Sequence, residues 1–423
     1  MTADKLSVKK IIADVGLPRI VIILFLILLI ILSHAHDMNV MRLFGDILRR
    51  WGMFGILILA MVPGIQSGIG PNFGVTVGIT GGLLGAVLSL EMRFRGWFDA
   101  FLVEPANVTV TSEVPMLPFD SNIYAAASRL ITPVITTVYG VNPQGYDFVT
   151  QHPTAPMFDL VGLATIFAAI LMGIGISMIM GMIYGFILNQ VKGSEMAISV
   201  YIGFSVVALF NIIWFTLPVR SGIMILPATG SGLRQNINLS DDFRNVFNRI
   251  GQFEIGTERI GHMNVPTGLL IVFFLMCLLM YWFSRSRTGL MMSAAGANPE
   301  YARASGIDVD RMRILGTTIS TVLGAVGIIV YAQSFGFLQL YSAPQWMGFG
   351  TVAAVLIGGA SVKRAKVSDV LIGALLFHGI LTIALPLSNR MLADVPALPE
   401  ILRVIITNGI ILYALSRAKG GRG

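Results

Sequence analysis

The chain alternates long apolar runs with shorter polar stretches. Ten runs are candidates for α-helices that cross a bilayer, which takes about 20 apolar residues each, and two of the ten are short or broken. We therefore expect an all-α, polytopic membrane protein with about ten transmembrane helices. The predicted spans are residues 19–33, 51–66, 73–90, 158–188, 198–217, 268–283, 314–331, 350–359, 370–385 and 401–415.

The polar stretches set the predicted organisation of the chain. Two of them are long and would lie outside the membrane, and Pro, Gly and β-branched residues suggest that the first is an external loop or a small cap. The predicted divisions are 1–90 with spans one to three, 91–157 as the first external loop, 158–217 with spans four and five, 218–266 as the second external loop, and 267–423 with spans six to ten and a cytoplasmic segment at 285–313.

Composition agrees with a membrane protein. The 423 residues are 55% hydrophobic and only 12% charged, and the mean hydropathy is +0.78. These values exclude a soluble domain of this size. The first apolar run follows Lys5, Lys9 and Lys10, so it is either a cleaved signal peptide or an uncleaved first span. We favour the uncleaved span, because the rest of the chain is already polytopic.

Charge predicts the orientation. Lys and Arg in short loops stay on the cytoplasmic side, and ten spans with a cytoplasmic N-terminus place all seven lysines there. Both termini are then cytoplasmic, whereas one missed span would break the segregation. Five arginines fall on the outer side and weaken the argument without reversing it: Arg42, Arg49, Arg50, Arg93 and Arg95. The net charge of +7 therefore suits lipid headgroups in the bilayer, and a nucleic-acid partner is not expected.

Two predicted spans are interrupted in a comparable way. Residues 64–82 (GIQSGIGPNFGVTVGITGG) and 342–359 (SAPQWMGFGTVAAVLIGG) both carry a Pro and a Gly-rich break, followed by Phe-Gly and then Gly-Gly. Backbone at membrane depth must be buried in protein or line a wet cavity. Paired breaks in oppositely directed segments are typical of an internal inverted repeat with a translocation path at its interface. The alternative is a chance likeness, because Gly and Pro are common in membrane helices.

The sequence offers little for bond chemistry or for ion coupling. No Asp or Glu lies deep in a predicted span, so coupling to an ion gradient within this chain is not expected. Metal-ligand spacing, HExxH and phosphate-cradling motifs are absent, and we expect neither a metal site nor an enzyme. His378 stands alone in a span, where a histidine hydrogen-bonded between helices is the simpler interpretation.

The polar stretch GANPEYARASGID, residues 296–308, predicts a short capped helix. Asn298 suits the N-cap, Pro299 the first helical position, and Glu300 the positive end of the helix dipole. Gly306 can end the helix in the left-handed conformation. A helix of about two turns is not stable alone, so another surface should pack on it. The alternative is an ordinary capped turn between two spans.

This stretch resembles the permease subunits of bacterial ABC importers of the ribose, galactose and branched-chain amino acid class. The likeness follows the pattern Gly-x-Asn-x-x-x-Ala-x-x-Ser-Gly-Ile, matched by Gly296, Asn298, Ala302, Ser305, Gly306 and Ile307. Two further stretches are similar to the family: YGFILNQVKGSEMAISVYIGF and VAAVLIGGASVKRAKVSDVLIGALL, the second with Gly358, Gly359 and Ser361 in place. The resemblance covers the membrane region from about residue 51 to the C-terminus, apart from the two external loops.

The resemblance implies a type II importer-like permease subunit in a bacterial cytoplasmic (inner) membrane. A periplasmic or lipid-anchored binding protein would deliver a small polar solute, which is a sugar, a sugar-like or a nucleoside-like molecule. A second permease, identical or related, would complete the path. A cytoplasmic ABC ATPase would bind ATP and Mg²⁺, so this chain would hold no cofactor of its own. The rival interpretation is a self-sufficient secondary carrier or channel.

Two sets of candidate residues follow. The segment that docks on the ATPase subunit in the family corresponds here to Gly296, Asn298, Pro299, Glu300, Tyr301, Ala302, Arg303, Ser305, Gly306 and Ile307. Aromatic and amide side chains near the two breaks suit a weakly held neutral solute. These candidate path residues are Gln66, Ser67, Asn72, Phe73, Gln345, Trp346 and Phe349.

The chain also departs from the sugar permeases. After the second span, the family's Gly-Ile-Asp-Leu-Ser-x-Gly motif is replaced by GIQSGIGPNFG, which lacks the carboxylate. QWMGFG stands where the family often has acidic residues. These departures are compatible with transport but leave the solute open.

Overall fold

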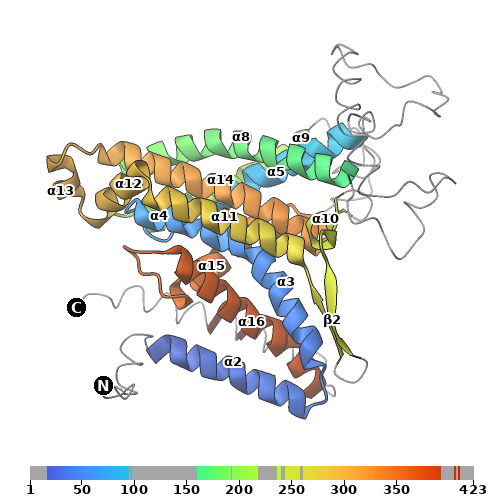
Figure 1. Cartoon of the computed structure of the whole chain (residues 1–423). Helices are drawn as coiled ribbons and strands as arrows, with labels where there is room; N and C mark the ends of the chain where they lie inside the picture. Colours follow the sequence, from blue (N-terminus) through green and yellow to red (C-terminus); the bar gives the residue numbers. More distant parts are fainter. Residues whose placement is uncertain are drawn as a thin grey trace, which may run out of the picture.

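The computed structural model describes residues 17–94, 97, 160–191, 193–217, 236–239, 243–257, 261–391, 404–405 and 408–409. Most of the predicted first external loop and of the tenth predicted span lies outside these residues. Within them the fold is mostly helical (Figure 1). The helices are α2 (Leu17–Ala35), α3 (Val40–Leu59), α4 (Met61–Gln66), α5 (Val75–Phe94), α8 (Leu160–Gln190), α9 (Glu195–Thr216), α10 (Val246–Arg249), α11 (Thr267–Arg285), α12 (Arg287–Ala297), α13 (Pro299–Ala304), α14 (Val309–Phe335), α15 (Ser342–Ile357) and α16 (Val367–Met391).

Seven helical segments of the described chain are long and apolar enough to cross a membrane. They are Val40–Gln66, Val75–Arg93, Val161–Gln190, Glu195–Trp214, Thr267–Arg285, Val309–Phe335 and Val367–Met391. Two further predicted spans correspond to shorter helices, namely α2 and the 16-residue α15. The length and composition of the seven segments therefore fit a polytopic membrane protein, and the count of about ten spans stays a prediction.

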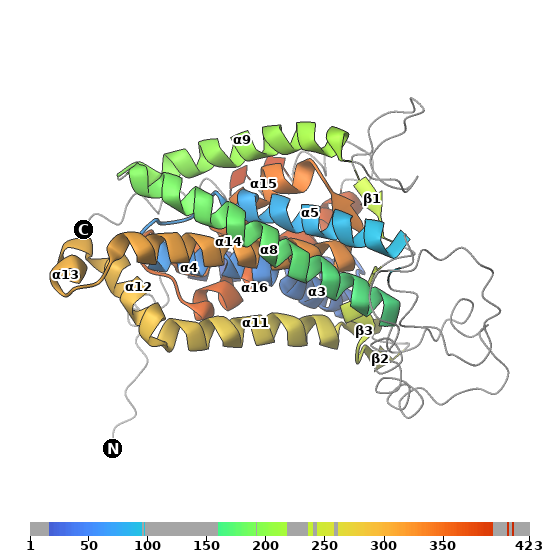
Figure 2. The same ribbon diagram turned by 90° about the horizontal axis from the view of Figure 1, so that it is seen from above.

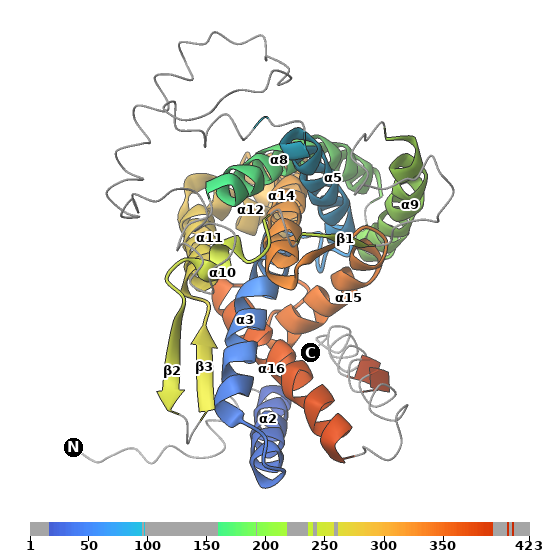
Figure 3. The same ribbon diagram turned by 90° about the vertical axis from the view of Figure 1, so that its right-hand side faces the viewer.

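Helix α14 forms the axis of the bundle (Figures 1 and 2). It packs against α5 and α8 on one side and against α3 on the other. Small residues allow these close approaches, as is common between membrane helices. A Cβ added to Gly82 of α5 would lie only 2.6 Å from Ala325 O of α14. On the far side of α3, helices α16 and α2 complete the bundle (Figure 3).

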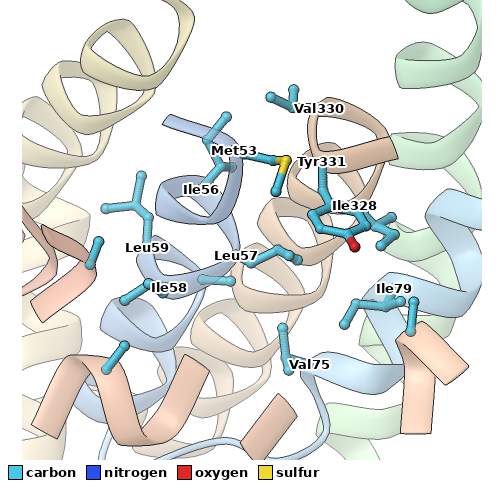
Figure 4. Packing of buried hydrophobic residues seen from close by; sticks show 14 of the residues in the cluster. Met53, Ile56, Leu57, Ile58, Leu59, Val75, Ile79, Ile328, Val330 and Tyr331 are labelled. Carbon is cyan, nitrogen blue, oxygen red and sulfur yellow. The ribbon is translucent and has the colours of Figure 1, made fainter. Parts of the chain in front are cut away.

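The buried core lies where α3, α14 and the start of α5 meet. Figure 4 shows Leu57 and Ile58 of α3 with Ile328 of α14 and Val75 of α5, all of them buried. In contrast, less than a third of the most apolar stretch of α8, α9 and α11 is buried. Their outward side chains are largely aliphatic and aromatic. A lipid environment accounts for such faces, because apolar side chains carry no penalty there.

The two ends of the bundle differ. At one end, the α13 end, α12 and α13 project beyond the other helices (Figure 1). At the opposite end, the hairpin end, strands β2 (Phe253–Thr257) and β3 (Gly261–Val265) pair antiparallel from Phe253 opposite Val265 to Thr257 opposite Gly261. Strand β1 (Asn236–Asn238) pairs antiparallel with β4 (Phe337–Gln339), which connects α14 to α15. The second predicted loop is therefore partly β-structured, which the sequence analysis did not anticipate.

Candidate functional site: the α13 segment, the first chain break and the start of α15

Helix α13 has the capped geometry that its sequence predicts. Asn298 Oδ1 accepts the N–H of Tyr301 at 3.0 Å, and Pro299 occupies the start of the helix. Gly306 ends the turn with φ of +79°, in the left-handed region. Its N–H donates to Arg303 O at 3.0 Å. The predicted cap, first position and glycine stop are confirmed.

One side chain of α13 fastens the helix to the bundle. Ala302 is fully buried and packs in a small apolar cluster with Ala295 of α12 and Val309 of α14. The rest of the predicted set faces outward: Asn298, Pro299, Glu300, Tyr301, Arg303, Ser305 and Gly306 are exposed, and Gly296 and Ile307 are half-buried. The Tyr301 side chain is 70% exposed. Helix α13 thus presents a mixed polar and aromatic surface and is anchored to the bundle by the buried Ala302.

An ion pair extends this unit into α14. The Arg303 guanidinium lies 3.8 Å from the Asp310 carboxylate. Asp308 caps α14 by accepting the N–H of Arg311 at 3.0 Å, and its other oxygen lies 3.0 Å from Arg311 Nε. The exposed pairs contribute little stability individually, but the cap fixes where α14 begins. A movement of α13 should therefore displace the first turns of α14.

The first break, residues 67–74, lies directly against the last turn of α12, which precedes α13. Gly68 and Gly70 have φ of +82° and +89°, which only glycine adopts readily. A Cβ on Gly68 would lie 2.8 Å from Gly296 Cα, and a Cβ on Gly316 of α14 would lie 2.5 Å from Ser67 Cβ. The break is therefore held between α12 and α14 with no side chain interposed at Gly68 and Gly296.

Three predicted path residues are bonded within this packed region. Gln66 Nε2 donates to Ala365 O at 3.0 Å, and Gln66 Oε1 lies 3.3 Å from the Ser284 hydroxyl. The buried Ser67 hydroxyl donates to Gly64 O at 3.0 Å. In these positions, Gln66 and Ser67 bind neighbouring backbone and helices.

Asn72 is the most strongly bonded of the three. Its Nδ2 donates to Ser320 Oγ at 3.2 Å. Its Oδ1 accepts the Gly74 N–H at 2.9 Å and the Tyr184 hydroxyl at 2.6 Å. The residue is fully buried, so these bonds join the break to α14 and α8 at a place where an unmade hydrogen bond is costly.

Three of the other four predicted path residues, Phe73, Gln345 and Phe349, line a narrow groove with a free volume of only about 10 Å³, and Trp346 lies beside it. The path groove is defined here by residues of α5, α9 and α15 and of the end of the first break: Phe73, Thr76, Val200, Gly203, Phe204, Gln345, Gly348 and Phe349. The Phe73 and Phe349 rings are 5.4 Å apart, and Trp346 lies beside Phe349 at 6.5 Å. Trp346 is 63% exposed. The prediction of a break at the start of residues 342–359 is wrong, because residues 342–357 form the uninterrupted helix α15. Pro344 is accommodated in its first turn, where a helix needs no donor from that residue. The end of the first break and the first turns of α15, far apart in sequence, therefore share one aromatic and amide surface.

Five groove residues were not singled out from the sequence: Thr76, Val200, Gly203, Phe204 and Gly348. Thr76 donates from Oγ1 to Pro344 O at 3.0 Å and so joins the start of α5 to α15. Phe204 of α9 lies 6.2 Å from Phe349, ring to ring. Phe204 sits inside a uniformly apolar run, which gives no positional signal for a path residue. None of the described groove residues is charged, and the described chain has no cluster of His, Cys, Asp or Glu that could hold a metal.

A second cavity of about 660 Å³ opens at the hairpin end, between the start of α3, α10 and the hairpin. Its lining is polar and carries charges of both signs, including Arg42, Arg249, Asp46 and Glu254. Arg49 borders it and donates from Nε to Ser334 Oγ at 3.2 Å, at the end of α14. In Figure 3 this region and the helices of the path groove lie on different sides of α14.

Comparison with known proteins places this geometry in context. A family model described as "Branched-chain amino acid transport system / permease component" matches residues 124–415, which is more than half of the chain. The nucleoside ABC transporter permease protein NupC of Lactococcus lactis is 31% identical over 145 residues, covering 30% of this chain and 45% of that protein. The fructose import permease protein FrcC of Rhizobium meliloti is 32% identical over 120 residues, covering 28% and 33%.

A longer match reaches the autoinducer 2 import system permease protein LsrC of an Enterobacter species. It is 26% identical over 232 residues, covering 54% of this chain and 61% of that protein. The chain thus spans less than half the length of NupC and FrcC and less than two thirds of LsrC in these matches. No solved structure matches the chain significantly.

Proposed function

The chain belongs to the family of branched-chain amino acid transport system permease components, and from that membership we propose that it is the permease subunit of an ATP-driven importer. It is a multi-pass membrane protein of the ABC permease type. The observation that carries the proposal is the packing of Gly296, beside α13, directly on Gly68 of the first break. This contact joins the exposed surface of α13, through the end of α12, to the first break, whose residue Phe73 lines the path groove.

Helix α13 would be the coupling helix. Its exposed Tyr301 and Arg303 offer an aromatic ring and a cation to a protein partner, and buried Ala302 holds the helix on the bundle. An ABC ATPase with ATP and Mg²⁺ would bind there on the cytoplasmic side, and this chain would contribute no cofactor. The cap and the packing of Ala302 on the bundle hold the short helix in place, which suits a docking element that must keep its shape between cycles.

The path groove would be one wall of the route for the solute. Its aromatic rings and the Gln345 amide suit a neutral polar molecule of the sugar or nucleoside kind, because rings stack and amides hydrogen-bond without trapping charge. NupC and FrcC are named for such solutes. Trp346, exposed at the groove, would face a second permease, identical or related, that closes the other wall.

The remaining topology completes the proposal. The chain would have ten spans in a bacterial inner membrane, with α13 and both termini cytoplasmic and the hairpin end facing the binding protein that delivers the solute. The stretches 64–82 and 342–359 would be related by an inverted repeat of the type II importer kind. Support comes from Phe73 at the first break and Phe349 in α15, which meet in one groove. The rival carrier or channel is less well supported, since no described groove residue is ionisable.

Co-purification tests the proposal. The chain is isolated from gently solubilised native membranes, with and without Arg303→Glu, and the proteins that come with it are identified by mass spectrometry. We expect an ABC ATPase with the unsubstituted chain and at least a tenfold loss of it with Arg303→Glu. The matched control is Arg249→Glu at the hairpin end, which should retain the ATPase. Recovery of the chain with no ATPase under these conditions would overturn the proposal.

A further inference from the structure

Helix α9 forms one wall of the path groove, but it makes few contacts with α8, the helix that precedes it. Val200, Gly203 and Phe204 line the groove, whereas less than a quarter of the most apolar window of α9 is buried. Its contacts are mainly with α5 and, at the groove, with α15. Apolar packing at Val207, Phe210 and Trp214 holds the middle and the far end of α9. A polar contact at its first residue adds a directional connection to another helix.

The first residue of α9 is held by a buried ion pair. The Arg313 guanidinium of α14 donates to the Glu195 carboxylate, and the two side chains are 9% and 15% exposed. Next to this pair, Asn189 near the end of α8 donates from Nδ2 to Asp310 O at 2.9 Å. Buried ion pairs are sensitive to the loss of one partner, because the remaining charge is left uncompensated.

Arg313 lies in α14, the helix that directly follows the coupling helix α13. It lies in the second turn of α14, which begins at Val309. Asp310, one turn before it, faces Arg303 of α13 at 3.8 Å. The route from the exposed face of α13 to the first residue of α9 therefore runs through the exposed Arg303–Asp310 pair, the start of α14 and the Arg313–Glu195 pair.

We propose that the Arg313–Glu195 pair makes α9 follow the coupling helix, so that a movement of α13 changes the path groove at Phe204. The pair acts as a positioning element, since neither side chain lines the groove. This inference rests on the proposed function, because it assigns the way in which the ATPase acts on the path. It predicts that breaking the pair separates ATP hydrolysis from solute movement without removing the ATPase.

Charge exchange provides the test. The permease, its ATPase and its binding protein are purified together and reconstituted in vesicles, and ATP hydrolysis and uptake of the solute are measured on the same preparation. The variants are Glu195→Gln, Glu195→Arg, Arg313→Glu and the double exchange Glu195→Arg with Arg313→Glu. The control is Arg19→Gln, which removes another partly buried pair, with Asp369 at 3.8 Å.

We expect the single variants that assemble to hydrolyse ATP at a rate within twofold of that of the unsubstituted complex. The ratio of solute taken up to ATP hydrolysed should fall at least tenfold. The double exchange should recover at least half of that ratio, and Arg19→Gln should leave it unchanged. A purely structural role would instead lower the yield and leave the ratio intact. An unchanged ratio in the assembled single variants, or no recovery on exchange, would overturn the inference. Failure of the unsubstituted complex to couple ATP to uptake would instead overturn the proposed function.

A measurement on the intact pair covers the case in which these variants do not fold. Spin labels at Ala197 of α9 and Arg311 of α14, both exposed, are introduced after Cys277→Ala, since Cys277 is the single cysteine of the chain. The distance between these labels should stay constant between nucleotide-free and ATP-trapped states. A second pair, at Ala197 and Lys366, should change between the same states. A change at the first pair with none at the second would overturn the inference.

Discussion

Gly68 of the first break meets Gly296 of α12 backbone to backbone, and a Cβ on Gly68 would lie 2.8 Å from Gly296 Cα. Gly68 also has φ of +82°, so the position needs glycine for two independent reasons. Gly296 lies in the last turn of α12, the helix that precedes the coupling helix. Gly68 lies near the start of the first break, and the groove residue Phe73 lies near its end. The contact thus joins the docking surface to the path directly.

Substitution at this contact should damage both stability and transport. Gly296→Ala places a methyl group 2.6 Å from Gly68 N, and such overpacking costs about 1–3 kcal/mol. Thermal unfolding of the purified protein in detergent should begin at a lower temperature, and uptake should fall by more than hydrolysis. The matched control is Gly175→Ala in α8, where a Cβ meets no atom within 4 Å. Equal behaviour of the two variants would contradict the contact.

Asn72→Ala should destabilise the first break. The change removes the acceptor for the Gly74 N–H and the Tyr184 hydroxyl, and a buried polar group without a partner costs about 1–3 kcal/mol. Tyr184→Phe removes only one of these bonds and should cost less. Denaturant or thermal unfolding in detergent measures the stability of the two variants relative to the unsubstituted protein. Asn72→Ala with unchanged stability and impaired uptake would instead indicate that Asn72 contacts the solute.

Phe349→Ala should weaken solute handling while leaving assembly intact. The Phe349 ring lies between those of Phe73 and Phe204, and an aromatic contact is worth about 0.5–1.5 kcal/mol. We expect the concentration for half-maximal uptake to rise roughly 2- to 12-fold, measured with the solute that the binding protein delivers. The control is Phe186→Leu on the outward face of α8, 60% exposed. An equal rise of this concentration in the control would contradict the assignment of Phe349 to the solute path.

Gly306→Pro should uncouple the permease without expelling it from the membrane. Proline fixes φ near −65°, whereas Gly306 has φ of +79°, and its N–H donates to Arg303 O. The stop of α13 is then lost and the exposed face reoriented. Membrane fractionation should show normal insertion, and uptake per ATP hydrolysed should fall at least tenfold. Unchanged uptake would contradict the assignment of α13 as the coupling helix.

The local geometry of α13 could be predicted from the sequence because capping depends on neighbouring residues. Asn298, Pro299 and Gly306 each act within one turn of the backbone. The long helices were equally accessible, since uninterrupted apolar length identifies them. The hairpin at 253–265 carried a usable signal, the alternation of Phe253 and Ile255 and of Met263 and Val265 with polar or small residues, which was overlooked beside the stronger helical pattern.

The groove could be predicted only in part, because its walls are chosen by tertiary packing. Phe73, Gln345 and Phe349 of the groove and Trp346 beside it were found through the Pro- and Gly-containing stretches 64–82 and 342–359, although the start of the second stretch is helical in the structure. Phe204 could not be found, since a helix that is apolar all round gives no indication of which face meets protein. For the same reason nothing local distinguished Asn72, bonded to Tyr184 and Ser320, from Gln345 in the groove. Both are amides in a Pro- and Gly-containing stretch.

The central claim is that ATP hydrolysis on a partner drives solute through this chain. The most direct measurement is uptake into vesicles that carry the purified complex, with ATP enclosed at the α13 side and the binding protein with its solute at the hairpin side. The account predicts accumulation that requires enclosed ATP, persists with ionophores and is lost with Arg303→Glu. Accumulation by the chain alone without ATP, abolished by an ionophore, would contradict the account and establish a gradient-driven carrier.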